Sequence, residues 1–171
     1  MSISIRLIEP DEYDRVSALT VAAYTADYDD LPDDYLAELA AVEPRAVAHQ
    51  VWVAVDDETG GILGTMATGK PGRPISGLAL EGELDYRLLA VDPAARGRGV
   101  GRALTEFTYG LARERGLHRV VMNSGENMVG AHRLYFGLGF ERVPEREHGV
   151  EVAPGEFMQI YVFSRAVTAA D

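Results

Sequence analysis

The pattern of hydrophobic and polar residues along the chain predicts a mixture of strands and helices. Short stretches in which apolar residues alternate with polar ones, or follow one another between turn signals, predict strands. They lie at residues 3–7, 51–55, 62–68, 84–91, 119–123 and 157–163. Stretches in which apolar residues recur every three or four positions predict helices. These lie at about residues 10–26, 33–42, 100–115 and 131–138.

Prolines and glycines mark where these elements begin and end. Pro10 stands in the first turn of the first helix, where its missing N–H is tolerated, and Pro44 is predicted to end the second helix. Gly116 and Gly139 follow the third and fourth helices at the position of a glycine C-cap. Residues 70–82 contain two prolines and three glycines, so they are predicted to form an exposed loop.

The order of these elements predicts an α/β (α+β) fold built on one sheet. A chain of 171 residues without repeats or linkers fits a single domain over residues 1–171. Its composition, 47% hydrophobic and 25% charged, is typical of a soluble globular protein. We expect a cytoplasmic protein, because the sequence has no secretory leader and no apolar run of the roughly 20 residues that a membrane helix needs.

Charge and cysteine content exclude several kinds of chemistry. The net charge of −11 argues against a nucleic-acid partner, because phosphate binding needs clustered Lys and Arg. This acidity either serves only to keep the protein soluble, or it also attracts a cationic acceptor such as an amine. The absence of cysteine excludes disulfides, thiolate metal sites and a thioester formed on the protein. The histidines do not have the spacing of a metal site, so we expect no metal.

A glycine- and arginine-rich segment follows the strand predicted at 84–91. It runs Arg96-Gly-Arg-Gly-Val-Gly-Arg102 and leads into the helix that begins near Val100. The N-terminus of a helix leaves about four N–H groups unpaired, and the glycines let a phosphate approach them closely. The segment lacks the Gly-Lys-Ser/Thr ending of a nucleotide P-loop and the spacing of the dinucleotide fingerprint. Taken alone, it is compatible with a diphosphate site or with a turn that carries solvated arginines.

Two motifs in this order resemble the GNAT (GCN5-related N-acetyltransferase) superfamily. The first is Leu-Ala-Val-Asp-Pro at residues 89–93, followed by Arg-x-x-Gly-x-Gly at residues 96–101. The second is Ala131-His-Arg-Leu-Tyr-Phe-Gly-Leu-Gly-Phe140, which resembles the family pattern A-x-x-L-Y-x-x-x-G-F. The resemblance covers about residues 84–141. It implies the GNAT acyl-CoA N-acyltransferase fold, in which a central mixed, mostly antiparallel sheet has helices on both faces.

The resemblance implies acetyl-coenzyme A (acetyl-CoA) as co-substrate and indicates which residues bind it. In the family, the pantetheine pairs with the backbone of the strand before the loop, and the diphosphate binds the loop amides. The residues at these positions are Leu89, Ala90, Val91, Arg96, Gly97, Arg98, Gly99, Val100, Gly101 and Arg102. Asn127 is either a further cofactor ligand or the N-cap of the helix that follows it.

The resemblance also indicates catalytic groups. Tyr135 matches the family's tyrosine near the thioester sulfur, where a protonated phenol can act as general acid; the alternative is a core aromatic. A base must remove a proton from the attacking amine. Asp85, acting through a water, is the expected base and Glu83 the second choice, because strand alternation puts both on the face of Leu89 and Val91. Alternatively, both are solvated acids at the start of a strand. A backbone N–H of Leu89 or Val91 is expected to stabilise negative charge on the thioester oxygen.

The function that the resemblance implies is N-acetyl transfer (EC 2.3.1.-) to the amine of a small molecule, amino acid, peptide or protein, by direct attack in a ternary complex. The Tyr- and Asp-rich segment 24–35 either attracts a cationic amine or is a solvated loop. Three other functions stay open: transfer of a longer acyl group, a non-catalytic CoA-binding sensor module, and an interaction protein whose arginines meet an acidic partner. We expect no nucleic-acid or membrane partner, and a homodimer is compatible with the sequence.

Overall fold

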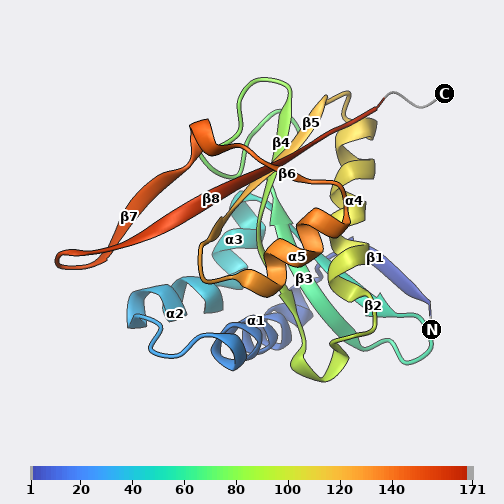
Figure 1. The fold of residues 1–171 in the computed structure, drawn as a ribbon. Helices are drawn as coiled ribbons and strands as arrows, with labels where there is room; N and C mark the ends of the chain where they lie inside the picture. The colour runs from blue at the N-terminus through green and yellow to red at the C-terminus, as the bar shows by residue number, and fades with distance from the viewer. Residues whose placement is uncertain (1, 169–171) are drawn as a thin grey trace.

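The computed structural model describes residues 2–168, in which eight strands form one sheet (Figure 1). The strands follow the order β1-β2-β3-β4-β5-β8-β6, and β7 pairs with β8. All of these pairs are antiparallel except β4 with β5. The strands are β1 (Ile3–Leu7), β2 (Gln50–Asp56), β3 (Ile62–Thr68), β4 (Glu83–Val91), β5 (Arg119–Gly125), β6 (Glu141–Arg142), β7 (His148–Ala153) and β8 (Glu156–Ala166). The predicted α/β fold with a mixed, mostly antiparallel sheet is confirmed.

Helices cover both faces of the sheet, and each face has its own hydrophobic core. The helices are α1 (Tyr13–Asp27), α2 (Asp33–Ala40), α3 (Val42–Ala48), α4 (Val100–Glu114) and α5 (Val129–Gly137). Under α4 and α5 the core includes Leu104, Met122 and Phe163. On the opposite face, Val16 of α1 and Val42 of α3 pack together with residues of the sheet. None of the helices in residues 2–168 is long and apolar enough to cross a membrane.

The second predicted helix is in fact two helices. Helix α2 ends at Ala40 and α3 begins at Val42, because Ala41 leaves the helical conformation with φ −78° and ψ 63°. The prediction that Pro44 ends a helix is wrong. Pro44 is the third residue of α3, and the N–H groups of a first helical turn have no partner within the helix, so proline is tolerated there.

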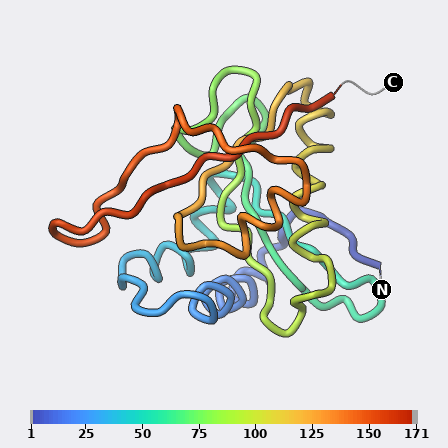
Figure 2. The backbone as a smooth tube through the Cα atoms, in the orientation of Figure 1, coloured from blue at the N-terminus to red at the C-terminus, as the bar shows by residue number. Residues whose placement is uncertain are grey.

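The C-terminal region forms a hairpin of β7 and β8, and β8 contains the strand predicted at 157–163. Strand β7 pairs along β8, and the two strands extend away from the rest of the sheet (Figure 2). Strand β7 is mostly exposed, so it lacks the alternation of buried and exposed residues by which a strand is recognised. The base of this hairpin lies beside the cavity described below.

Strand β4 contains one extra residue halfway along its length. Thr65 of β3 pairs with Ala90, and Ala67 pairs with Arg87, so two steps along β3 correspond to three along β4. Leu88 lies within this bulge at φ 56°, a left-handed conformation that is rare for a residue other than glycine. The bulge changes which face of the sheet the following side chains occupy.

Strands β4 and β5 separate at the same place. They pair only through Glu83–Asp85 and Arg119–Val121, although both strands continue beyond these residues. The edge of β4 that faces β5 therefore has no strand partner after Asp85 in the described chain. Backbone N–H and C=O groups along that edge are left for a ligand or for water.

Candidate active site

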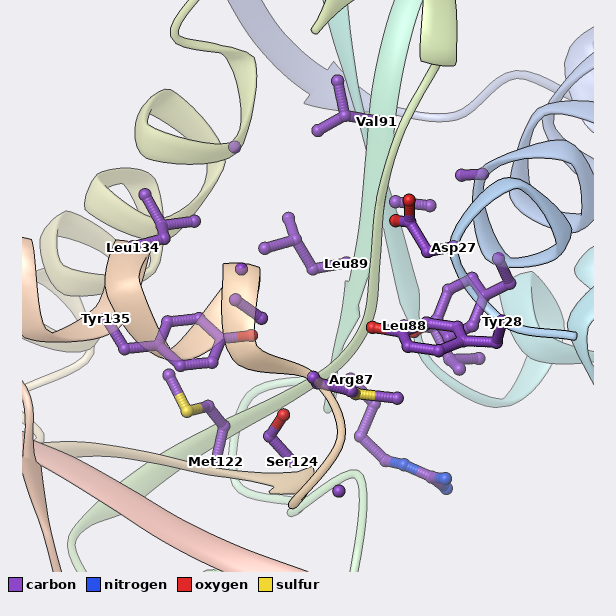
Figure 3. Close-up of a pocket in the computed structure, with 18 of the residues that line it drawn as sticks. Asp27, Tyr28, Arg87, Leu88, Leu89, Val91, Met122, Ser124, Leu134 and Tyr135 are labelled. Atoms are coloured by element: carbon purple, nitrogen blue, oxygen red, sulfur yellow. The ribbon is translucent and has the colours of Figure 1, made fainter. Parts of the chain in front are cut away.

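A cavity of about 980 Å³ lies where β4 and β5 separate. Its walls come from α1, β4, the loop before α4, β5, α5 and the β7–β8 hairpin. Figure 3 shows Tyr135 on one side of β4, and Tyr28 and Asp27 on the other. Most of the site residues predicted from the sequence line this cavity, namely Leu89, Ala90, Val91, Arg96, Gly97, Gly99, Val100, Gly101, Arg102, Asn127 and Tyr135. Arg98, Asp85 and Glu83 do not.

The glycine loop leaves the N-terminus of α4 open toward the cavity. Gly97 and Gly99 have φ values of 75° and 79°, a conformation that glycine adopts far more readily than other residues. A Cβ atom placed on either residue would meet no other atom within 4 Å, so there is free space over this backbone. Gly99 is the N-cap of α4, and no described side chain caps it. The first N–H groups of α4 are therefore available to an anion, and the site fits a diphosphate.

The arginines of the loop are bound to acidic side chains. Arg96 donates to both carboxylate oxygens of Asp27 at 2.6 and 2.9 Å, which connects the loop to α1. Arg98 donates to the carboxylate of Asp56 at 2.9 Å and lies outside the cavity wall. Arg102 pairs at 3.3 Å with a glutamate one turn further along α4. The backbone amides, more than the guanidinium groups, are thus the donors presented to a diphosphate.

Tyr135 of α5 lies in the cavity with its hydroxyl pointing toward β4 (Figure 3). Its ring packs against Phe163 and Phe140, with centroids 5.3 and 6.1 Å away. Burial raises the pKa of Tyr135 well above its usual value, and the nearby hydroxyls of Tyr86 and Tyr28 raise it further. The phenol therefore keeps its proton at neutral pH, as a general acid must.

Asp85 and Glu83 are engaged in structural contacts. Asp85 is buried and accepts hydrogen bonds of 2.6 to 2.9 Å from the N–H of Ile75 and from the N–H and hydroxyl of Ser76. Glu83 accepts hydrogen bonds from Arg146, both at 3.1 Å. Burial raises the pKa of Glu83, but the hydrogen bonds from Arg146 and from a backbone N–H outweigh it and hold this pKa below its usual value. Both carboxylates thus anchor the loop before β4 and the segment after β6.

The prediction that Asp85 shares a face with Leu89 and Val91 is wrong. Leu84 and Tyr86 lie in the same core as Leu89 and Val91, under α4 and α5. Asp85, between Leu84 and Tyr86, points to the opposite face. The bulge in β4 adds one residue before Leu89, so simple alternation along the strand fails there. The base role of both carboxylates stays a prediction, and their positions favour a structural role.

Replacing Asp85 by Asn tests this structural role. The amide can accept with only one oxygen, so we expect the free energy of unfolding to fall by on the order of 2 kcal/mol, because hydrogen bonds to a buried charge are lost. The pH profile of activity should stay unchanged, since the carboxylate does not reach the cavity. Denaturant unfolding and initial rates across pH measure the two effects. Asp14→Asn, which removes an exposed charge on α1, is the control. A stable Asp85→Asn protein with a shifted pH profile would restore the base role.

Asn127 lines the cavity and does not cap α5. The N-cap of α5 is Met128, at φ −84° and ψ 54°, and no side-chain cap bond is present there. The cap interpretation of Asn127 is therefore wrong. Its side-chain oxygen lies close to Gly125: a Cβ atom added to Gly125 would be only 2.8 Å from the Asn127 oxygen. A cofactor contact by Asn127 stays a prediction.

Three tyrosines of the segment 24–35, which the sequence indicated as a possible acceptor region or a solvated loop, line the cavity: Tyr24, Tyr28 and Tyr35. Sequence reasoning did not predict Arg87 and His148, which also line it. Of the acidic residues in that segment only Asp27 lines the cavity, and its carboxylate is bound to Arg96. No group of three or more His, Asp or Glu within residues 2–168 is arranged to hold a metal ion.

The fold and this site define a class of protein in which a mixed, mostly antiparallel sheet splays between two strands beside the open N-terminus of a helix that follows a glycine-rich loop. The family model described as an acetyltransferase (GNAT) domain matches residues 48–142. The chain therefore belongs to the GNAT acetyltransferase family, and the family resemblance found in the sequence is confirmed.

Relatives and solved structures agree with the family. Mycothiol acetyltransferase from Beutenbergia cavernae is 39% identical over 94 residues, which are 54% of this chain and 29% of that protein. N-acetyltransferase 8 from Mus musculus is 35% identical over 96 residues, 55% of this chain and 39% of that protein. The chain thus spans only 29% to 39% of the length of these curated relatives.

Two solved structures are similar over almost the whole chain. A GCN5-related N-acetyltransferase from Kribbella flavida has a TM-score of 0.67 at 25% identity, over 96% of this chain and 97% of that one. The protein yncA from Salmonella typhimurium, solved with its cofactor acetyl-CoA, has a TM-score of 0.67 at 21% identity, over 98% of this chain and 95% of that one. The second likeness shows the fold alone.

Proposed function

We propose that the protein transfers the acetyl group of acetyl-CoA directly to an amine, in a complex that holds both substrates, and that residues 1–171 act as one N-acetyltransferase domain. The observation that carries the proposal is a single cavity in which three features meet: the open N-terminus of α4, the unpaired edge of β4 and the Tyr135 side chain. Membership of the GNAT family supports an acyl-CoA donor. The similarity to mycothiol acetyltransferase and N-acetyltransferase 8 supports the acetyl group.

The donor would be held mainly by backbone groups of this chain. The amides between Arg96 and Arg102 suit its diphosphate, because they combine an open helix N-terminus with residues that lack a Cβ. The open edge of β4 at Leu89, Ala90 and Val91 suits the amide groups of the pantetheine. The volume of about 980 Å³ is at the upper end of small-molecule sites, which fits a large donor together with an acceptor.

Each catalytic task can be assigned to a group of this chain. Acetyl-CoA supplies the acetyl group as a thioester, which an unprotonated amine can attack. An N–H of Leu89 or Val91 stabilises the negative charge that develops on the carbonyl oxygen. Tyr135 donates its proton to the sulfur as the carbon–sulfur bond breaks. No carboxylate predicted as base reaches the cavity, so the amine loses its proton to water. The chain has no cysteine, which supports transfer without a thioester on the protein.

A CoA-release assay across a panel of amines, amino acids and peptides tests this function. We expect thiol release that depends on both acetyl-CoA and an acceptor, and slower release with longer acyl-CoA donors. Calorimetric titration with acetyl-CoA accompanies the assay. Binding of acetyl-CoA without release for any acceptor would point to a CoA-binding sensor module, and absence of binding would point to an interaction protein. Either result would overturn the proposal.

A further inference from the structure

One arginine of the cavity has its charge largely available to a ligand. Three arginines line the cavity. Arg96 donates two hydrogen bonds to the carboxylate of Asp27, and Arg102 is paired along its own helix. Arg87 has Glu38 as its ion-pair partner, at an N–O distance of 3.6 Å, which is too long for a hydrogen bond. Within the described part of the chain, the Arg87 side chain makes no hydrogen bond. Its guanidinium donors are therefore available.

Arg87 lies on the opposite side of β4 from Tyr135. It precedes the bulge, so its side chain lies on the face of α2, where Glu38 is its ion-pair partner. In Figure 3 the Arg87 side chain points away from Tyr135. Arg87 also lines a second, smaller cavity of about 270 Å³ between α2, α3 and β4. The cation thus lies across β4 from Tyr135, on the side of the cavity that α1 and α2 line.

The contact with Glu38 is of the kind that a ligand can replace. The side chains of Arg87 and Glu38 are 40% and 48% exposed, and exposed ion pairs contribute little to stability. The planar guanidinium binds a carboxylate through two parallel hydrogen bonds when the geometry allows it. A second arginine, Arg45, lies on the same wall and is fixed by the backbone carbonyls of Glu38 and Leu39. The wall of the smaller cavity therefore carries two arginines and one glutamate. This makes it locally positive in a chain whose net charge is −11.

We infer that the acceptor is a compact amine that carries a carboxylate near its amino group, such as a free amino acid, and that Arg87 binds this carboxylate. The inference rests on the proposed acetyl transfer. Arg87 is two residues from Leu89, whose backbone is assigned to the reacting carbonyl, and the bulge at Leu88 lies between them, so their Cα atoms are at most roughly 7 Å apart. One small molecule can span this distance with its carboxylate at Arg87 and its amine at the reaction centre. A simple alkylamine, or the N-terminus of a peptide without a nearby acid, cannot use the cation.

Matched acceptors test the inference. Initial rates are measured at saturating acetyl-CoA for a free amino acid, its carboxamide and the corresponding amine without a carboxyl group. With the wild-type protein we expect the free amino acid to have a kcat/KM about 10- to 100-fold higher than the other two, the usual effect of hydrogen bonds to a charged group. Arg87→Gln should remove this preference, mainly through KM, and leave the carboxamide within about twofold. Arg87→Lys, which keeps the charge, should restore part of it.

Arg113→Gln is the matched control, because Arg113 is exposed on α4, stacks on Tyr109 and lies outside both cavities. Thermal melting of each variant establishes that it is folded. Equal kcat/KM for the three acceptors in an active wild type, or equal effects of Arg87→Gln and Arg113→Gln, would overturn the inference and leave the acetyl transfer intact. Absence of turnover with every acceptor, despite acetyl-CoA binding, would overturn the proposed function and this inference with it.

Discussion

Replacing Tyr135 by Phe is expected to slow the acetyl-transfer step by about 10² to 10⁴, the usual contribution of a general acid. The ring should keep its packing against Phe163 and Phe140, so stability and acetyl-CoA affinity should change little. Burial keeps the pKa of Tyr135 well above its usual value, so the wild-type rate should show no loss from tyrosine ionisation as the pH rises through neutrality. The measurement is the single-turnover rate at saturating acetyl-CoA and acceptor.

Tyr161→Phe is the control for the loss of a tyrosine hydroxyl. Tyr161 packs against the same core through a ring contact with His132, but it does not line the cavity. The Tyr161→Phe substitution should leave the single-turnover rate unchanged. Equal rates for wild type and Tyr135→Phe would reduce Tyr135 to a packing residue, with CoA leaving as a thiolate that takes its proton from water.

Replacing Gly99 by Val is expected to weaken acetyl-CoA binding by at least about 100-fold. A Cβ at Gly99 meets no protein atom within 4 Å, so the new side chain would occupy space that the diphosphate needs. Loss of two hydrogen bonds to a charged group, at about 1.5–3 kcal/mol each, accounts for an effect of this size. Isothermal titration calorimetry with acetyl-CoA measures it.

Gly116→Val separates this effect from backbone strain. Gly116 follows α4 with φ 69°, a Cβ there also meets nothing within 4 Å, and it lies outside the cavity. Both substitutions force a β-branched residue into a left-handed conformation, at a cost on the order of 1–3 kcal/mol. We expect similar losses of stability and a loss of acetyl-CoA affinity in Gly99→Val only. If both variants bind acetyl-CoA as tightly as the wild type, the loop is not the diphosphate site.

The geometry of the glycine loop and the start of α4 was predictable because local sequence determines it. Glycines at Gly97 and Gly99 adopt positive φ in the structure, and the helix after them begins where the apolar spacing resumes. Six of the eight strands and most helix ends follow from periodicity and from glycines such as Gly116. The prediction that Pro44 ends a helix failed because the local sequence does not distinguish a proline that ends one helix from a proline in the first turn of the next.

The rest of the cavity depends on contacts that sequence spacing does not encode. Leucine rarely adopts positive φ, so nothing in the sequence placed a bulge at Leu88, and the faces assigned to Asp85 and its neighbours were reversed. The partners of Arg87 and Arg98 are 49 and 42 residues away in sequence. Only the folded sheet brings such groups together, which is why Arg87 emerged from the structure alone.

The most direct measurement of the central claim follows the acetyl group itself. Protein at a concentration above that of isotopically labelled acetyl-CoA is mixed with an amine acceptor, quenched at intervals and separated into protein and small molecules. Direct transfer predicts that label appears on the acceptor nitrogen at the rate of CoA release, and that the protein never carries it. Labelled protein that forms and decays before labelled acceptor, or CoA release without labelled acceptor, would contradict direct acetyl transfer.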